Sequence, residues 1–203
     1  MRRWLLACST LLLGFFLLCW WWLQPVTPHV EAVLTLGRQV DTSYSVVGSP
    51  TISAAFINQV LAASHSPAAG KGQALSDLGV KYGIDPVYAL AFFWHESGFG
   101  TTGEARVTRS LGNERCIADR PCIDQNRGGY ALMHSWEDGF DHWYALIRYG
   151  YVEGQVTLPL VGHVCTTLDQ IVPVYAPSND GNDVAAYIAA VKQAVETWRS
   201  GQV

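Results

Sequence analysis

The sequence has 203 residues, of which 49% are hydrophobic and 15% charged, and 17 acidic residues against 13 lysines and arginines give a net charge of −4. These values suit one globular domain with an added apolar segment, and they exclude a disordered chain. No basic stripe or tail is present, so nucleic acid is excluded as an expected partner, because neutralising phosphates supplies most of that affinity.

An apolar segment follows the first three residues. Residues 4–23 carry no charge, come after two arginines and end close to three tryptophans. Such a segment can span a bilayer as a helix, with the arginines inside and the tryptophans at the far interface. We therefore predict a signal anchor over residues 1–23, a single-pass location in the cell membrane and an extracellular body. Cleavage of the segment, and hence secretion, is the alternative.

Prolines and glycines interrupt residues 24–50, which predicts a linker before a folded domain over residues 51–203. Apolar residues at helical spacing predict helices over residues 51–63 and 73–82. A further helix is predicted up to Ser97, with Asp85 as its N-cap, Pro86 in its first turn and Gly98 as its stop.

Glycines, prolines and charges interrupt every apolar run in residues 101–129, which predicts a small irregular or β-hairpin lobe. Helical signals return at Ser135, where a capping-box pattern begins. A shorter helix is predicted over residues 167–172 and a final amphipathic one over residues 183–199. The expected fold is mainly α, with a helical body and one small lobe.

Two cysteines stand close together in the predicted lobe. Cys116 and Cys122 can close a small loop as a disulfide in an oxidising compartment. A zinc site is the alternative, but it needs two more ligands at short spacing. We expect the disulfide, no metal and no cofactor, with Cys165 left as a buried thiol.

One carboxylate ends the most apolar of the predicted helices. Phe92 and Phe93 precede Glu96 by four and three positions, so the carboxylate shares a helix face with aromatic rings. A carboxyl group with little water around it favours its neutral form and can donate a proton near neutral pH. We predict that Glu96 is a general acid; a solvated residue at a frayed helix end is the alternative.

The run WHESGFGTTG at residues 94–103 resembles the Glu-Ser-Gly/Ser-x-Gly-Thr-Ser/Thr motif of glycoside hydrolase family 73, the β-N-acetylglucosaminidases of the bacterial autolysin type within the lysozyme superfamily. The resemblance extends from about residue 50 to residue 201 and includes an asparagine-containing turn, a Tyr-Ser-Asp-His pattern and a late Tyr-Ala motif. The disulfide loop and the sequence Asn-Glu-Arg at residues 113–115 depart from the family. By resemblance, Asn113, Tyr130 and His142 bind substrate, and Tyr175 lies beside the cleft.

The resemblance implies a lysozyme-like domain that cleaves the β-1,4 bond after N-acetylglucosamine in peptidoglycan glycan strands. Glycoside hydrolysis commonly needs a second carboxylate besides the acid, or the substrate's own acetamido group. Among the acidic residues of the lobe, which include Glu104 and Glu114, we prefer Asp119 or Asp124, because the disulfide loop could present either. Tyr175 is expected to orient the acetamido group or water.

Aromatic side chains are expected to supply platforms for sugar rings. Phe99 and Trp136 are the predicted platforms, with Trp94 a further one, although such residues also fill cores. Two other functions stay open. A lytic transglycosylase of the same superfamily needs one acid and no water, and a degenerate wall-binding module would keep the cleft without turnover. The sequence does not predict an oligomeric state.

Overall fold

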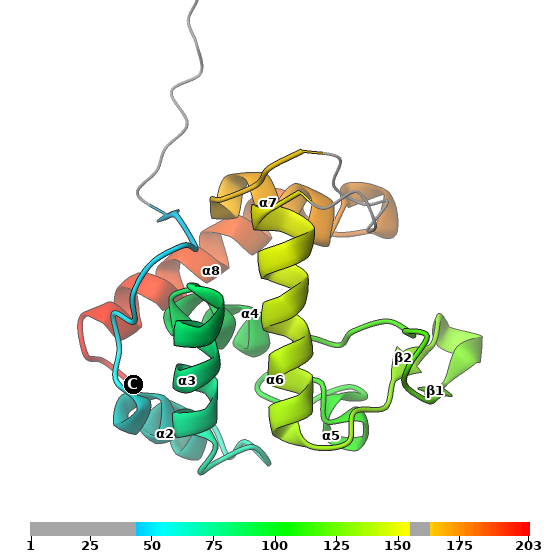
Figure 1. The fold of residues 1–203 in the computed structure, drawn as a ribbon, viewed down its shortest axis with the longest axis horizontal. Coiled ribbons are helices and arrows are strands. Elements are labelled where there is room, and N and C mark those ends of the chain that lie inside the picture. Colours follow the sequence, from blue (N-terminus) through cyan, green and yellow to red (C-terminus); the bar gives the residue numbers. More distant parts are fainter. Residues whose placement is uncertain (1–43, 155–162) are drawn as a thin grey trace, which may run out of the picture. The chain divides into compact units, whose positions relative to one another are not determined.

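A computed structural model describes residues 44–154 and 163–203 (Figure 1). The chain divides into two units, Met1–Val40 and Asp41–Val203, and all described residues belong to the second. The predicted signal anchor and most of the predicted linker therefore lie outside the described residues. Within the two described ranges, no helix is both long and apolar enough to cross a bilayer.

The described unit is mainly helical with one small hairpin, as predicted. Figure 1 shows α3 and α6 side by side with α4 behind them, and the hairpin on the opposite side of α6 from α3. In chain order the elements are α2 (Ala54–Ala63), α3 (Gly72–Tyr82), α4 (Pro86–Ser97), α5 (Ala105–Thr108), β1 (Cys122–Ile123), η2 (Gln125–Arg127), β2 (Tyr130–Ala131), α6 (Trp136–Ala145), the π-helical η3 (Leu146–Val152), α7 (Leu168–Tyr175), η4 (Ser178–Asp180) and α8 (Val184–Arg199).

The predicted helices are confirmed, with some ends displaced. Helix α2 begins at Ala54 because the Ser53 side chain caps it by accepting a hydrogen bond from the Phe56 N–H. Helix α7 continues beyond residue 172 to Tyr175, although Pro173 lies inside it. Proline removes one helical hydrogen bond. Ile171 and Val172, which directly precede it, are buried in the core and hold the helix there.

Helix α4 lies in the centre of the core. All residues from 84 to 93 are buried, and α8 packs along α4. The ring of Phe93 lies 5.7 Å from that of Phe140 and 5.2 Å from that of Trp143, measured between centroids. Burial of each large apolar side chain contributes roughly 2–3 kcal/mol, so α4 is a firmly held element on which to place a reactive group.

Residues 44–50, which the sequence assigns to the linker, pack against the folded unit. Val46 is 1% exposed, and its main chain bonds to Thr166 and to Asp85. The neighbouring Ser45 and Val47 form isolated bridges to other segments of the unit. The proline and glycine content predicts a lack of regular structure here, but it gives no information on these cross-chain main-chain bonds.

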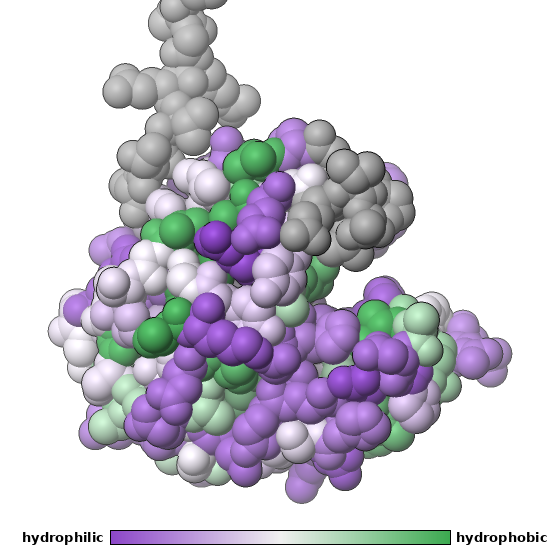
Figure 2. Space-filling model, viewed as in Figure 1, coloured by the Kyte–Doolittle hydropathy of each residue, from purple (hydrophilic) through white to green (hydrophobic). Residues whose placement is uncertain are grey.

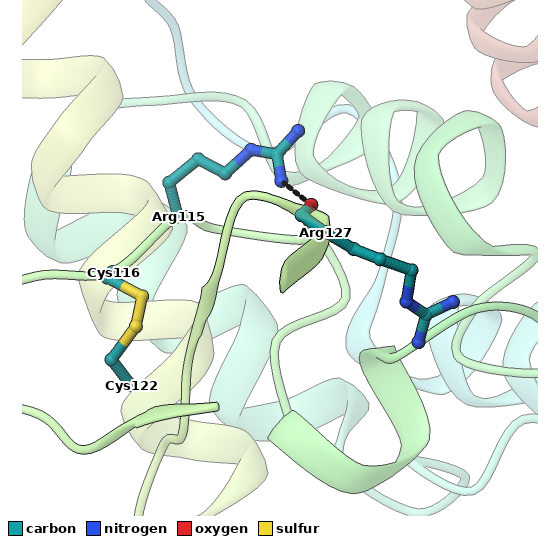
Figure 3. Close-up of a disulfide and its surroundings, with 4 residues drawn as sticks. All are labelled: Arg115, Cys116, Cys122 and Arg127. Atoms are coloured by element: carbon teal, nitrogen blue, oxygen red, sulfur yellow. Dashed lines mark hydrogen bonds between the residues drawn. A yellow bond between two sulfur atoms is a disulfide. The ribbon is translucent and has the colours of Figure 1, made fainter. Parts of the chain in front are cut away.

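The lobe is built on a two-stranded hairpin and a disulfide. Strand β1 pairs antiparallel with β2, and Cys116 and Cys122 form the expected disulfide, with their Cα atoms 5.2 Å apart (Figure 3). Gly129 has a φ of +73°, and a Cβ there would lie 2.5 Å from the Cys116 sulfur. None of residues 115–128 is buried. The lobe is therefore held together by covalent and polar contacts and not by a hydrophobic core of its own.

Figure 2 shows a face that is mostly hydrophilic, with small separate apolar areas. The lobe stands out at the right of that view, and the surface is indented above it.

Candidate active site

The start of α4 is fixed by Asp85, which is 1% exposed. Its carboxylate accepts hydrogen bonds from the Val87 N–H, from the Thr51 hydroxyl at 2.7 Å and from the Arg199 guanidinium at 3.1 Å. Arg199 is the last residue of α8. The beginning of α4 is thus tied to the end of α8, and the opposite ends of these two helices bring Glu96 to Tyr187.

A tight turn ends α4 directly after the predicted acid. Gly98 has a φ of +54°, and the N–H groups of Gly98 and Phe99 bond to the last carbonyls of the helix. The Ser97 hydroxyl donates to the Leu111 carbonyl at 2.8 Å and accepts from the Gly100 N–H at 2.9 Å. This turn holds the segment that follows Leu111 beside the end of α4.

Glu96 combines partial burial with a short hydrogen bond. Its side chain is half-buried, and its Oε1 accepts a hydrogen bond from the Tyr187 hydroxyl at 2.6 Å. Burial raises the pKa of Glu96 above its ordinary value, against the smaller opposing effects of Tyr187, of the Arg115 charge and of Asn113. A raised pKa keeps the proton available near neutral pH, which general acid catalysis requires.

Tyr187 is the contact that the sequence analysis missed. It is 4% exposed, and its ring centroid lies 5.7 Å from that of Phe92 and 3.8 Å from that of His95. Its position four residues before Val191 on the buried stripe of α8 could have placed it towards the core. Only the packing of α8 on α4 shows that its hydroxyl meets Glu96.

Two residues chosen by resemblance lie next to the acid. The Asn113 side chain donates to the main-chain oxygen of Glu96 at 2.8 Å. The Tyr175 hydroxyl donates to the Gly112 carbonyl at 3.2 Å and lies 3.3 Å from the indole nitrogen of Trp143, from which it accepts. These bonds fix the main chain on both sides of the turn. The substrate-orienting role of Tyr175 stays a prediction, and in this state its hydroxyl has two protein partners.

The preferred second carboxylates, Asp119 and Asp124, are each paired with an arginine. The Asp119 carboxylate is 67% exposed and lies 2.8 Å from the Arg120 guanidinium. The Asp124 carboxylate lies 2.5 Å from the guanidinium of Arg127, which also contacts Glu104. Their catalytic roles stay predictions. Within residues 44–154 and 163–203, no three histidine, cysteine or acidic side chains are grouped as a metal site requires.

Glu114 and His142 form a pair near the turn that follows α4. The Glu114 residue is 8% exposed, and its carboxylate lies 3.4 Å from the Ser110 hydroxyl and 3.5 Å from the His142 Nδ1. The contact with Glu114 raises the pKa of His142. Burial and, to a smaller extent, the charges of Glu96 and Glu114 raise the pKa of Tyr175, so both carboxyl groups lie near that tyrosine.

The predicted aromatic platforms differ in their exposure. Phe99 is 1% exposed and packs in the core, so its ring presents no open face to a sugar. Trp136 is partly buried against the core, and Tyr130 is covered by the Arg115 guanidinium, 4.8 Å from the ring centroid. Trp94 is 43% exposed and is therefore the open aromatic ring on α4.

The helical body, the carboxyl group at the end of its central helix and the adjoining hairpin lobe form a fold like that of a bacterial autolysin. The chain is similar to Autolysin E of S. aureus, with 13% sequence identity, a TM-score of 0.53 and coverage of 78% of this chain and 72% of that one. That structure holds the muropeptide NAM-L-Ala-D-iGlu. A catalytic glutamate-to-alanine mutant of the same protein, in complex with the disaccharide NAG-NAM, matches with the same values.

No protein-family model matches the chain, and no curated protein matches it by sequence. The predicted resemblance to the autolysin type is confirmed at the level of the fold, by the similarity to Autolysin E.

Proposed function

We propose that the chain is a peptidoglycan hydrolase that cleaves the β-1,4 bond after N-acetylglucosamine, with Glu96 as its general acid. One observation carries the proposal: in a fold shared with Autolysin E, a half-buried carboxyl group with a raised pKa ends the central helix. Tyr187, which holds the carboxyl group by a 2.6 Å hydrogen bond, supports the same assignment.

In the proposed reaction, Glu96 gives its proton to the glycosidic oxygen while that oxygen takes the electron pair of its bond to C1. The positive charge that develops at C1 then needs a nucleophile. Asp119 and Asp124 are held by arginines, and Glu114 is buried against His142. We infer that the 2-acetamido oxygen of the substrate attacks C1 and forms a ring. Water then opens this ring by adding to C1 and gives a proton back to the Glu96 carboxylate.

The pairing of Asp119 and Asp124 with arginines also favours a second function. A lytic transglycosylase uses one acid and closes the muramic acid on its own 6-hydroxyl, so it needs no second carboxylate. The two reactions leave different ends on the products, a reducing sugar for the hydrolase and a 1,6-anhydro sugar for the transglycosylase.

Mass spectrometry of muropeptides released from bacterial peptidoglycan by the full chain tests the proposal. We expect reducing N-acetylglucosamine ends, and a rate reduced by about 10²–10⁴-fold in Glu96→Gln. The control Glu196→Gln, at an exposed position of α8, should retain the full rate. Anhydro ends would establish the transglycosylase, whereas binding without release by every variant would establish a wall-binding module.

We also propose that the enzyme works outside the cell, anchored by residues 4–23 or released after their cleavage. The disulfide supports an oxidising compartment. Fractionation of cells that express the full chain, followed by protease treatment from outside, tests this location. Recovery of a protected chain in the cytosolic fraction would contradict it.

A further inference from the structure

One arginine of the lobe, close in sequence to a residue that contacts Glu96, has no acidic partner among the described residues. Arg115 is exposed, and among the described residues no carboxylate lies within ion-pair distance of it. By contrast, Arg120 and Arg127 of the same lobe each contact two carboxylates. The positive charge of Arg115 is therefore available to a ligand.

Its guanidinium is nevertheless held in place. The Nη1 group donates to the Arg127 carbonyl at 3.2 Å (Figure 3). The guanidinium also lies over the Tyr130 ring, 4.8 Å from the ring centroid. A Cβ on Gly128 would lie 2.7 Å from the same nitrogen, so glycine leaves the space that the guanidinium occupies. Arg115 is thus held by one N–H group and by one face of its guanidinium. Its other N–H groups stay free, and they lie in one plane, as the binding of a carboxylate requires.

The sequence places the Arg115 guanidinium near Glu96. Arg115 lies two residues after Asn113, whose side chain is bonded to the main chain of Glu96. The positive charge of Arg115 also lowers the pKa of Glu96, an effect smaller than the increase that burial causes. A substrate that presents its glycosidic oxygen to Glu96 therefore has neighbouring groups close to Arg115.

We propose that Arg115 binds a carboxylate of the glycan substrate beside the bond that Glu96 cleaves, and so selects acidic strands over neutral ones. This inference rests on the proposed function. Two parts of peptidoglycan carry that chemistry, the lactyl group of muramic acid where no peptide is attached and the acidic residues of the stem peptide where one is. Either gives the guanidinium a partner that a neutral amino-sugar polymer lacks.

The test uses the full chain and four substrates. Two carry free carboxylates, namely peptidoglycan with its stem peptides and glycan strands from which the peptides have been removed. The other two are the same materials with their carboxylates converted to methylamides. The variants are Arg115→Gln, Arg115→Lys and the control Arg106→Gln, which removes the same charge from an exposed position of α5. Each variant is assayed at its own pH optimum, and its melting temperature is recorded.

We expect Arg115→Gln to raise KM about tenfold on a substrate with free carboxylates, while kcat changes little. A tenfold change is the size expected for the loss of one charge-assisted hydrogen bond. On the amidated substrate the wild-type KM should already be raised, and Arg115→Gln should add nothing. Arg115→Lys should lie in between, and Arg106→Gln should match the wild type. An effect on peptide-free strands assigns the lactyl carboxylate, and an effect only with peptides present assigns the stem peptide.

An equal loss on free and amidated substrates would overturn the proposal, because it would show that Arg115 only supports the lobe. Unchanged KM in Arg115→Gln on both free substrates would overturn it too. Absence of cleavage by the wild type on all four substrates contradicts the proposed function itself, and the inference falls with it. The wild-type rate on the free substrates therefore separates the two failures.

Discussion

The helical body and the hairpin lobe keep their residues in place by different means. Residues 84–93 of the body are all buried, whereas none of residues 115–128 of the lobe is. The disulfide, the hairpin bonds and the contacts of three arginines take the place of a core in the lobe. The Glu96 carboxyl group is thus placed by apolar packing, whereas the charged groups of the lobe are placed by polar and covalent contacts.

Because one packed core holds the body, a substitution in that core should lower the stability of the whole domain. Phe93→Ala should lower the free energy of unfolding by about 3–5 kcal/mol, because it leaves a cavity beside Phe140 and Trp143. The neighbouring substitution Trp94→Ala, at a 43% exposed position of the same helix, should change it by less than about 1 kcal/mol. Denaturant unfolding of the two variants measures both values, and equal losses would contradict the comparison.

Damage to the lobe should stay local. Replacement of Cys116 and Cys122 by serine should cost about 2 kcal/mol, since it frees a short loop in the unfolded chain. Hydrogen exchange should quicken at the amides of β1 and β2, while the amides of α4 keep their protection. The wild type in reducing buffer is the matched control. Equal loss of protection in α4 would show that the lobe and the body unfold together.

The acid itself should reduce the stability of the body. Because the folded-state pKa of Glu96 is raised, the folded state binds its proton more tightly than the unfolded state, and the free energy of unfolding falls as pH rises through that pKa. Glu96→Gln should therefore stabilise the chain by about 1 kcal/mol at pH 8 and by little at pH 4. Melting temperatures across this range, with Glu196→Gln as control, test the sign. Destabilisation at pH 8 would contradict the raised pKa.

The smallest expected effect is at the junction of body and lobe. The pKa of His142 is raised by Glu114, so the pair stabilises the fold fully below the unfolded pKa of about 6.5 and loses this contribution as pH rises through the folded-state value. Because the ring is part-exposed, we expect His142→Gln to cost only on the order of 0.5 kcal/mol at pH 5.5 and less at pH 8.5. Unfolding at the two pH values measures this, and a larger loss at pH 8.5 would reverse the assignment.

Sequence patterns recovered the parts of this protein that depend on nearby residues. The bounds of α4, the caps at Asp85 and Ser135 and the Cys116–Cys122 pairing all follow from residues a few positions apart. The same patterns placed residues 44–50 in a linker, because bonds such as that from Val46 to Thr166 leave no periodic signal.

The sequence by itself determined that a carboxyl group would end a buried helix and lose much of its water, because apolar spacing and a glycine stop are local properties. Only the tertiary structure decided what meets that group. The Tyr187 hydroxyl, 91 positions away in the sequence, bonds to Glu96. Asp119 and Asp124 form ion pairs with arginines, whereas Arg115 forms none among the described residues. Hydrogen bonds and ion pairs depend on distances of a few ångströms, which the packing of α8 on α4 and the closure of the lobe set.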